Sequence, residues 1–232
     1  MPRLLFVGVL LLGAFACTSS HVQPSRIPVD TIRYVPLGDS YTAGTGSTPD
    51  DAFPAQLTEL LHNEGFRIQL VENPSQPGAT SMDIINYQLP VFRSQHPTFA
   101  TLLVGANDVN QGVSVDVFRV NFTSLVDDML NTLPASRPLI IATIPDFTLT
   151  PVGRQAARGR DLKDAIAEFN RVIHEEATDR NLQVADFYTQ SLDFDRLDIA
   201  LDGLHPSPRG HRTFASALLG PATELLILPE VD

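Results

Sequence analysis

The chain has 232 residues, of which 43% are hydrophobic and 19% charged, and its formal net charge is −11. This composition is sufficient for one domain with a single apolar core, and it excludes a disordered or fibrous protein. The acidic balance, 27 Asp and Glu against 16 Lys and Arg, argues against nucleic-acid binding, because phosphate contacts need a basic surface.

Residues 1–16 have the features of a signal peptide. Arg3 precedes an apolar run that is too short to span a bilayer and that ends just before Cys17. Three outcomes are open: cleavage that releases a secreted protein, lipidation of Cys17 (the only cysteine) as in a bacterial lipoprotein, or a retained anchor. Residues 17–32 lack periodicity and are predicted to be a flexible tether. We therefore expect export, either as a secreted protein or lipid-anchored at the outer face of a bacterial membrane, in the periplasm or at the cell surface.

Strand and helix patterns alternate along residues 33–232, which we predict to be one domain. Short apolar runs predict strands at 34–37, 68–71, 101–104, 139–144 and 182–187. Apolar residues at helical spacing predict helices at 52–64, 81–88, 118–133, 162–173 and 210–226. The second of these should stop at Pro90, and the last should be interrupted at Pro221. Residues 147–160 are predicted to be a loop that either walls a pocket or only connects two elements.

Strands that alternate with helices imply βαβ units. We therefore predict an α/β fold, a flavodoxin-like three-layer α/β/α sandwich with a five-stranded parallel sheet. In such open sheets, ligands bind outside the carboxyl ends of the strands. Polar clusters follow four of the predicted strands. In chain order, these clusters are Gly38-Asp39-Ser40, Asn73 with Gly78-Ala79-Thr80-Ser81, Gly105-Ala106-Asn107-Asp108, and Asp202-Gly203-Leu204-His205-Pro206.

Three residues of these clusters suit nucleophilic catalysis. A serine hydroxyl is a poor nucleophile until a base removes its proton, and His205 can be that base for Ser40. Asp202, three residues before the histidine, can accept the other imidazole N–H within one tight turn. Asp39 and Asp108 are expected to support nearby loops through hydrogen bonds to the backbone.

The order of the clusters resembles that of the GDSL, or SGNH, hydrolase family. Its four name-giving residues correspond to Ser40, Gly78, Asn107 and His205, and the resemblance runs from about residue 33 to 212. It implies a serine esterase with no metal or cofactor. Ser40, His205 and Asp202 would form the triad, and the backbone N–H groups of Ser40 and Gly78 with the Asn107 amide would form the oxyanion hole. The expected substrates are carboxylic esters of short to medium acyl chains or lysophospholipid-type lipids.

Other functions remain open from the sequence. A carbohydrate O-deacetylase that acts on cell-wall or plant polysaccharide would use the same triad. A metal-dependent phosphoesterase would need several histidine ligands, and only His205 follows a strand. The other histidines, His62, His96, His174 and His211, are predicted to be surface or helix residues, and His21 belongs to the tether. A non-catalytic surface binding module is a further alternative.

Overall fold

A computed structural model describes residues 31–227, apart from positions 137, 158 and 160. The predicted signal peptide 1–16, Cys17 and nearly all of the predicted tether 17–32 lie outside the described residues. Ile32, which we assigned to the end of that tether, instead begins the first strand, where it pairs with Ile68. The strand therefore starts one residue before the predicted domain boundary.

The strands form parallel pairs throughout. β1 (Ile32–Tyr34) and β2 (Leu37–Gly38) are successive parts of the first predicted strand, and the others are β3 (Ile68–Leu70), β4 (Ala100–Leu103), β5 (Leu139–Ala142) and β6 (Gln183–Ala185). β1 pairs with β3, β2 pairs with β4, and a bridge joins Tyr34 to Phe99 beside them. The strands are thus a two-stranded sheet, β1 with β3, and a four-stranded sheet in the order β2, β4, β5 and β6, in place of the single five-stranded sheet predicted. Because the bridge at Tyr34 sets the two sheets side by side, the spatial order is β3, then β1 with β2, then β4, β5 and β6. This is the flavodoxin-like order, and it confirms the predicted fold class.

The first strand is divided in two because Pro36 lies in its middle. Val35 donates its N–H to the carbonyl of Phe99 at 3.1 Å, but Pro36 has no N–H to continue the ladder. Tyr34 still accepts a hydrogen bond from the chain after β3, through the N–H of Val71. After the proline, β2 pairs with β4, so that Gly38 ends the strand beside Leu103.

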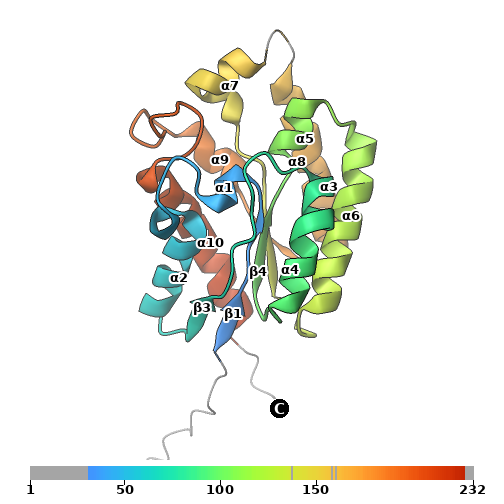
Figure 1. Ribbon diagram of the computed structural model, residues 1–232, viewed down its shortest axis with the longest axis vertical. Coiled ribbons are helices and arrows are strands. Elements are labelled where there is room, and N and C mark those ends of the chain that lie inside the picture. Colours follow the sequence, from blue (N-terminus) through green and yellow to red (C-terminus); the bar gives the residue numbers. More distant parts are fainter. Residues whose placement is uncertain (1–30, 137, 158, 160, 228–232) are drawn as a thin grey trace, which may run out of the picture.

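Helices cover both faces of the sheet, which is the middle of three layers (Figure 1). One face carries α2 (Phe53–Asn63), α9 (Phe187–Leu192) and α10 (Pro208–Leu226). The other carries α3 (Ser81–Asp83), α4 (Leu89–Ser94), α6 (Val115–Thr132) and α8 (Leu162–Asp179). Every residue of β4 and β5 is buried, as expected for central strands of a sheet covered on both sides.

The helix predicted at 81–88 was expected to stop at Pro90. It instead continues past this residue to Ser94. The turn before the proline, η2 (Ile84–Gln88), is a wider π-helical turn. A wider turn relieves the clash between a proline ring and the carbonyl four residues earlier, which would otherwise end the helix.

The predicted interruption of the last helix at Pro221 is also wrong, since α10 runs through this residue to Leu226. Leu218 and Ala222, on either side of the proline, are completely buried. Packing against the domain therefore keeps the helix continuous where the local sequence disfavours it.

The segment 147–160, predicted to be a loop, contains a 3₁₀ turn, η3 (Phe147–Leu149), and the short helix α7 (Pro151–Ala156). The Thr150 side chain accepts a hydrogen bond from the Gly153 N–H at 3.0 Å, and Pro151 occupies the first helical position. A threonine cap followed by proline is a helix-start signal, and the sequence interpretation overlooked it. A side chain at position 153 would collide with the Phe147 carbonyl, so this glycine lets α7 pack against η3.

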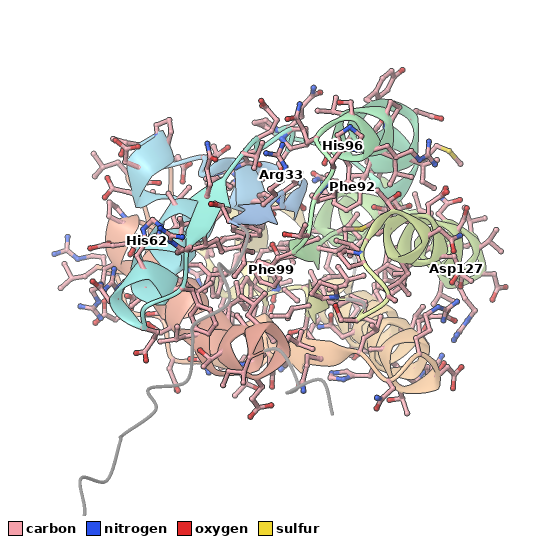
Figure 2. All side chains as sticks on the ribbon, turned by 90° about the horizontal axis from the view of Figure 1, so that it is seen from below. Arg33, His62, Phe92, His96, Phe99 and Asp127 are labelled. Carbon is pink, nitrogen blue, oxygen red and sulfur yellow. The ribbon has the colours of Figure 1, made fainter. Side chains whose placement is uncertain are left out.

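The amino ends of the strands lie at the lower end of the molecule, which Figure 2 shows from below. There the Arg33 guanidinium donates to the carbonyls of Gln95 and His96, at 2.7 and 3.2 Å, and ties β1 to the chain after α4. His62 lies 2.5 Å from the Ile68 carbonyl through its Nε2 atom. None of the polar clusters identified in the sequence lies at this end. No helix within the described part of the chain is long and apolar enough to cross a membrane.

Candidate active site

The polar clusters meet at the opposite end, where the strands finish. α1 (Ser40–Ala43) follows β2 almost directly, and α5 (Ala106–Gln111) follows β4 after two residues. Figure 1 shows both short helices at the upper end of the molecule, below α7. The turn after β3 and the segment before α10 complete this edge, as the rule for ligand sites in open parallel sheets predicts.

Ser40 is the first residue of a one-turn helix. Asp39 is its N-cap, and the Asp39 carboxylate accepts a hydrogen bond from the Tyr41 N–H at 3.0 Å. Gly38 has to be a glycine, because a Cβ there would lie 2.1 Å from the Thr42 hydroxyl oxygen and 2.7 Å from the Leu103 carbonyl oxygen. The tight passage from strand to helix therefore fixes the direction of the Ser40 side chain.

A continuous chain of hydrogen bonds joins Ser40, His205 and Asp202. The Ser40 Oγ atom lies 2.9 Å from His205 Nε2, and His205 Nδ1 lies 2.7 Å from Asp202 Oδ2. Because the carboxylate accepts the proton of Nδ1, Nε2 is left as the acceptor for the serine hydroxyl. This is the protonation state that a general base needs.

The Asp202 carboxylate is held by its own loop. Its Oδ1 atom accepts the backbone N–H groups of Leu204 at 2.9 Å and His205 at 3.0 Å, in a turn that Gly203 permits with a φ of 73°. Burial alone would raise the pKa of Asp202, but hydrogen bonds from Leu204 and His205 outweigh it and hold the pKa below its ordinary value. The carboxylate therefore carries its charge beside the imidazole at neutral pH. Tyr41 packs edge-on against the His205 ring, with the ring centroids 5.7 Å apart.

Gly78 and Asn107 lie on the other side of Ser40. Gly78 has a φ of 83°, which favours glycine, and its N–H makes no hydrogen bond with any described residue. The Asn107 Nδ2 atom donates to the Ala79 carbonyl at 3.0 Å and lies 3.3 Å from Asp39 Oδ2. Asn107 thus contacts the chain neighbours of both Gly78 and Ser40, and it joins the ends of three strands.

Asp39 is buried completely under this junction. The pKa of its carboxyl is raised to about 7, mainly because of burial; the Tyr41 N–H opposes the change and the charge of the nearby Asp108 adds to it. The Asp39 carboxyl group is therefore held between two donors, Tyr41 and Asn107, and its pKa is close to neutral pH.

Asp108 fixes the start of α3 and hence the turn that carries Gly78. Its two carboxylate oxygens accept the Ser81 N–H at 2.9 Å and the Ser81 hydroxyl at 2.5 Å. Asn121, from the middle of α6, donates to the same hydroxyl at 3.1 Å. Sequence interpretation expected Asp108 to bind nearby backbone but did not identify Ser81 as its partner, or Asn121 as a second partner of Ser81, because the three residues come from distant elements.

A pocket opens beside Ser40 and His205. α5 contributes Ala106 and Asn107, and the segment around α7 contributes Phe147, Val152 and Ala156. Most of these side chains are apolar. Of the two roles left open for residues 147–160, walling a pocket is the one that the structure gives them.

His211, predicted to be a surface or helix residue, lies on α10 and is completely buried. It faces inward from α10 with Phe214, Ala215 and Leu218, at the three- and four-residue spacing that should have predicted burial. Its ring stacks on Phe53 at 6.4 Å, and neither ring nitrogen has a hydrogen-bond partner within the described residues. Burial lowers the pKa of His211 to about 4, and the nearby Thr45 backbone opposes this shift.

The other histidines with described structure, His62, His96 and His174, have exposed side chains away from this edge. No group of three or more His, Cys, Asp or Glu side chains in the described part of the chain is arranged to hold a metal ion.

Comparison with known proteins places the chain in a family. The GDSL-like Lipase/Acylhydrolase family matches residues 37–213, which include all four polar clusters. No protein of curated function matches the chain significantly in sequence.

Solved structures share the fold. A lipase/acylhydrolase from Enterococcus faecalis superposes with a TM-score of 0.69 at 22% identity, over 87% of this chain and 100% of that one. TesA superposes with a TM-score of 0.67 at 21% identity, over 84% of this chain and 99% of that one. A family 3 carbohydrate esterase from Clostridium thermocellum gives 0.67 at 22% identity, over 84% and 97% of the two chains. With its sequence matched over more than half its length and its sheet order in agreement, the chain belongs to the GDSL-like lipase and acylhydrolase family.

Proposed function

We propose that this protein is a serine esterase that hydrolyses carboxylic esters through a covalent acyl intermediate on Ser40. The observation that carries the proposal is the hydrogen-bonded chain from Asp202 through His205 to the Ser40 hydroxyl. Family membership and the apolar pocket beside Ser40 support it.

In the first half of the reaction, His205 Nε2 takes the proton of Ser40 as Oγ attacks the ester carbonyl carbon. The tetrahedral intermediate then collapses, its carbon–oxygen bond to the alcohol breaks, and the His205 imidazolium gives its proton to the leaving alcohol. In the second half, His205 takes a proton from water, whose oxygen attacks the acyl carbon. Ser40 regains its proton as the acid leaves, and Asp202 stabilises the imidazolium in both halves.

The negative oxygen of the tetrahedral intermediate needs hydrogen-bond donors, and we assign these to the backbone N–H groups of Ser40 and Gly78 and to the Asn107 amide. The N–H of Gly78 has no partner within the described residues, so it can donate without breaking another bond. Asn107 keeps its 3.0 Å bond to Ala79, and the oxyanion would replace its longer contact of 3.3 Å with Asp39.

Replacing Ser40 with alanine tests the proposal. The variant Ser40→Ala should lose p-nitrophenyl ester hydrolysis by a factor on the order of 10³ or more, and it should no longer be labelled by a fluorophosphonate. Ser216→Ala is the matched control, because this exposed serine on α10 bonds only to the Arg212 carbonyl. If Ser40→Ala kept a large part of the activity, Ser40 would not be the nucleophile.

The substrates proposed are esters with short to medium acyl chains, because the pocket beside Ser40 is mostly apolar and is walled on one side by α7. Lysophospholipids and acetylated carbohydrates are candidate sources of such esters. A metal-dependent phosphoesterase is the rival from another class. Activity that EDTA abolishes and an added metal ion restores would favour this rival.

We further propose that the protein is exported and that Cys17 carries a lipid that holds it at a membrane. The protein purified from a bacterial membrane fraction should have the intact mass of a chain without residues 1–16 that carries a diacylglyceryl and an acyl group. Cys17→Ala should move the protein to the soluble fraction. A mature mass without lipid would contradict attachment and leave simple secretion.

A further inference from the structure

A second pocket lies behind the pocket beside Ser40. Both are lined by Tyr41, Phe147 and Leu204, which form the wall between them. The second pocket is bounded further by Asp146, at the end of the segment after β5, and by Pro206. It therefore lies against the loop that carries His205, next to the pocket beside Ser40.

Asp146 brings an unsatisfied acceptor to this pocket. The residue is only 2% exposed, and its Oδ1 atom accepts the N–H and the hydroxyl of Thr148. Its Oδ2 atom is buried without a hydrogen-bond partner among the described residues. Buried carboxylate oxygens are costly unless they are paired, so this one indicates a place for a hydrogen-bond donor from outside the chain.

The two aliphatic hydroxyls that line the pocket, those of Ser191 and Thr150, donate elsewhere, and Thr150 donates to the Phe147 carbonyl at 2.8 Å. The Ser191 hydroxyl, which also lines the pocket, donates to the Tyr188 carbonyl at 2.6 Å and accepts the Asp146 N–H at 2.8 Å. These bonds also hold the backbone of Asp146 against α9. The position of the carboxylate is therefore fixed, and its second oxygen accepts no hydrogen bond from the described residues, although the Tyr41 phenol also lines the pocket.

The chemistry of the proposed reaction says which part of an ester would reach this pocket. His205 must protonate the oxygen of the leaving alcohol, so that alcohol lies against the imidazole. Leu204 and Pro206, on either side of His205 in the chain, both line the second pocket. The acyl group then occupies the apolar pocket under α7, and the alcohol points toward Asp146.

We infer that the second pocket binds the leaving alcohol and that Asp146 Oδ2 accepts a hydrogen bond from a free hydroxyl group on it. The preferred substrates would then be partial esters of polyols, in which a hydroxyl remains close to the ester bond. Glycerol and sugar esters share this chemistry. The inference rests on the proposed esterase function, and it adds a specificity-determining residue outside the triad and the oxyanion donors.

Matched esters test it. Glycerol monobutyrate and propyl butyrate share the acyl group and the length of the alcohol, but only the first has free hydroxyls. Methyl glucoside 6-butyrate and cyclohexylmethyl butyrate form the corresponding pair for a sugar. The wild-type protein should prefer the hydroxylated member of at least one pair by about tenfold in kcat/KM, as a hydrogen bond to a buried charge allows, and the preferred pair identifies the source.

Asp146→Asn keeps an acceptor for Thr148 but replaces the unpaired oxygen with an amide N–H group. It should remove most of the preference for the hydroxylated ester while it leaves kcat/KM for propyl butyrate and p-nitrophenyl butyrate within about twofold. Asp186→Asn is the matched control, because Asp186 follows β6 and also accepts the N–H and hydroxyl of a nearby threonine, Thr189, but pairs both of its oxygens in doing so. This control should keep the preference.

Ile199→Trp gives a second test that does not depend on the folding of Asp146→Asn. Ile199 lines the pocket and is only partly buried, so a larger side chain should fill the pocket and remove the same preference. The inference would be overturned if both variants lost kcat/KM equally for all four esters. It would also be overturned if the wild-type protein showed no preference for the hydroxylated member of either pair. Absence of hydrolysis of every ester, including p-nitrophenyl butyrate, would instead contradict the proposed function.

Discussion

His205 is positioned by contacts from two separate parts of the chain. Its own loop supplies Asp202, while Tyr41 packs against its ring from α1. Burial raises the pKa of Tyr41, so its phenol stays neutral beside the imidazole. On the other side of Ser40, Asn107 is held by Ala79 and lies near Asp39. At the scale of single residues, the site is therefore fixed before a substrate arrives.

Asn107 offers the sharpest prediction at this scale. Asn107→Ala should lower kcat by a factor on the order of 10² with little change in KM, because the lost donor acts on the transition state and two backbone donors remain. Asn86→Ala, at an exposed position in η2, is the control and should keep full activity. Steady-state kinetics with p-nitrophenyl acetate measure both variants, and a change confined to KM would contradict the assigned role.

Among the elements, α7 and α5 decide the size of the pocket beside Ser40. α7 can lie close to η3 because Gly153 has no side chain to meet the Phe147 carbonyl. Its Val152 and Ala156 then face the pocket from one side, while Ala106 and Asn107 of α5 face it from the other. The small side chain at position 156 leaves room for an acyl group.

Ala156→Phe should therefore shorten the acyl chain that the site accepts. We expect the ratio of kcat/KM for p-nitrophenyl octanoate to that for the acetate to fall by about tenfold or more, since the exclusion of even one methylene group from an apolar pocket costs about 1–3 kcal/mol. Gln155→Phe adds the same bulk at the neighbouring exposed position of α7 and should leave the ratio unchanged. An unchanged ratio in Ala156→Phe would mean that the acyl group lies elsewhere.

For the whole molecule, two buried groups oppose each other in their effect on stability. Asp39 has a raised pKa of about 7 in the folded protein and a pKa near 4 in the unfolded chain. Its contribution to the free energy of unfolding is therefore fully present below about pH 4 and is lost as the pH rises toward 7. His211 has a lowered pKa of about 4 in the folded protein and a pKa near 6.5 in the unfolded chain. Its contribution to the free energy of unfolding is therefore fully present above about pH 6.5 and is lost as the pH falls toward 4.

The two contributions should separate when each group is replaced. Asp39→Asn should show a more positive change in the free energy of unfolding from pH 4.5 to pH 7 than the wild-type protein, and His211→Leu a more negative one. Each difference should amount to a few kcal/mol, measured by urea unfolding at the two pH values. Changes of the same sign in both variants would contradict this account.

The sequence predicted most of the sheet because buried parallel strands are short, continuous apolar runs with few other interpretations. It failed where tertiary packing overrides local preference. Pro90 and Pro221 stand inside helices that the rest of the domain holds in place. The short helix α7 was missed because the sequence pattern around Thr150 was interpreted as a loop.

The sequence by itself determined the family, the sheet and which residue types follow each strand, because these depend on order and spacing along the chain. Only the tertiary structure decided which side chains meet. Ser40 and His205 are separated by 165 positions and lie 2.9 Å apart. Nothing local indicated the unpaired oxygen of Asp146 or the bond from Asp108 to Ser81. Burial and hydrogen-bond partners are properties of the packed domain, since each depends on groups that distant elements bring to the same place.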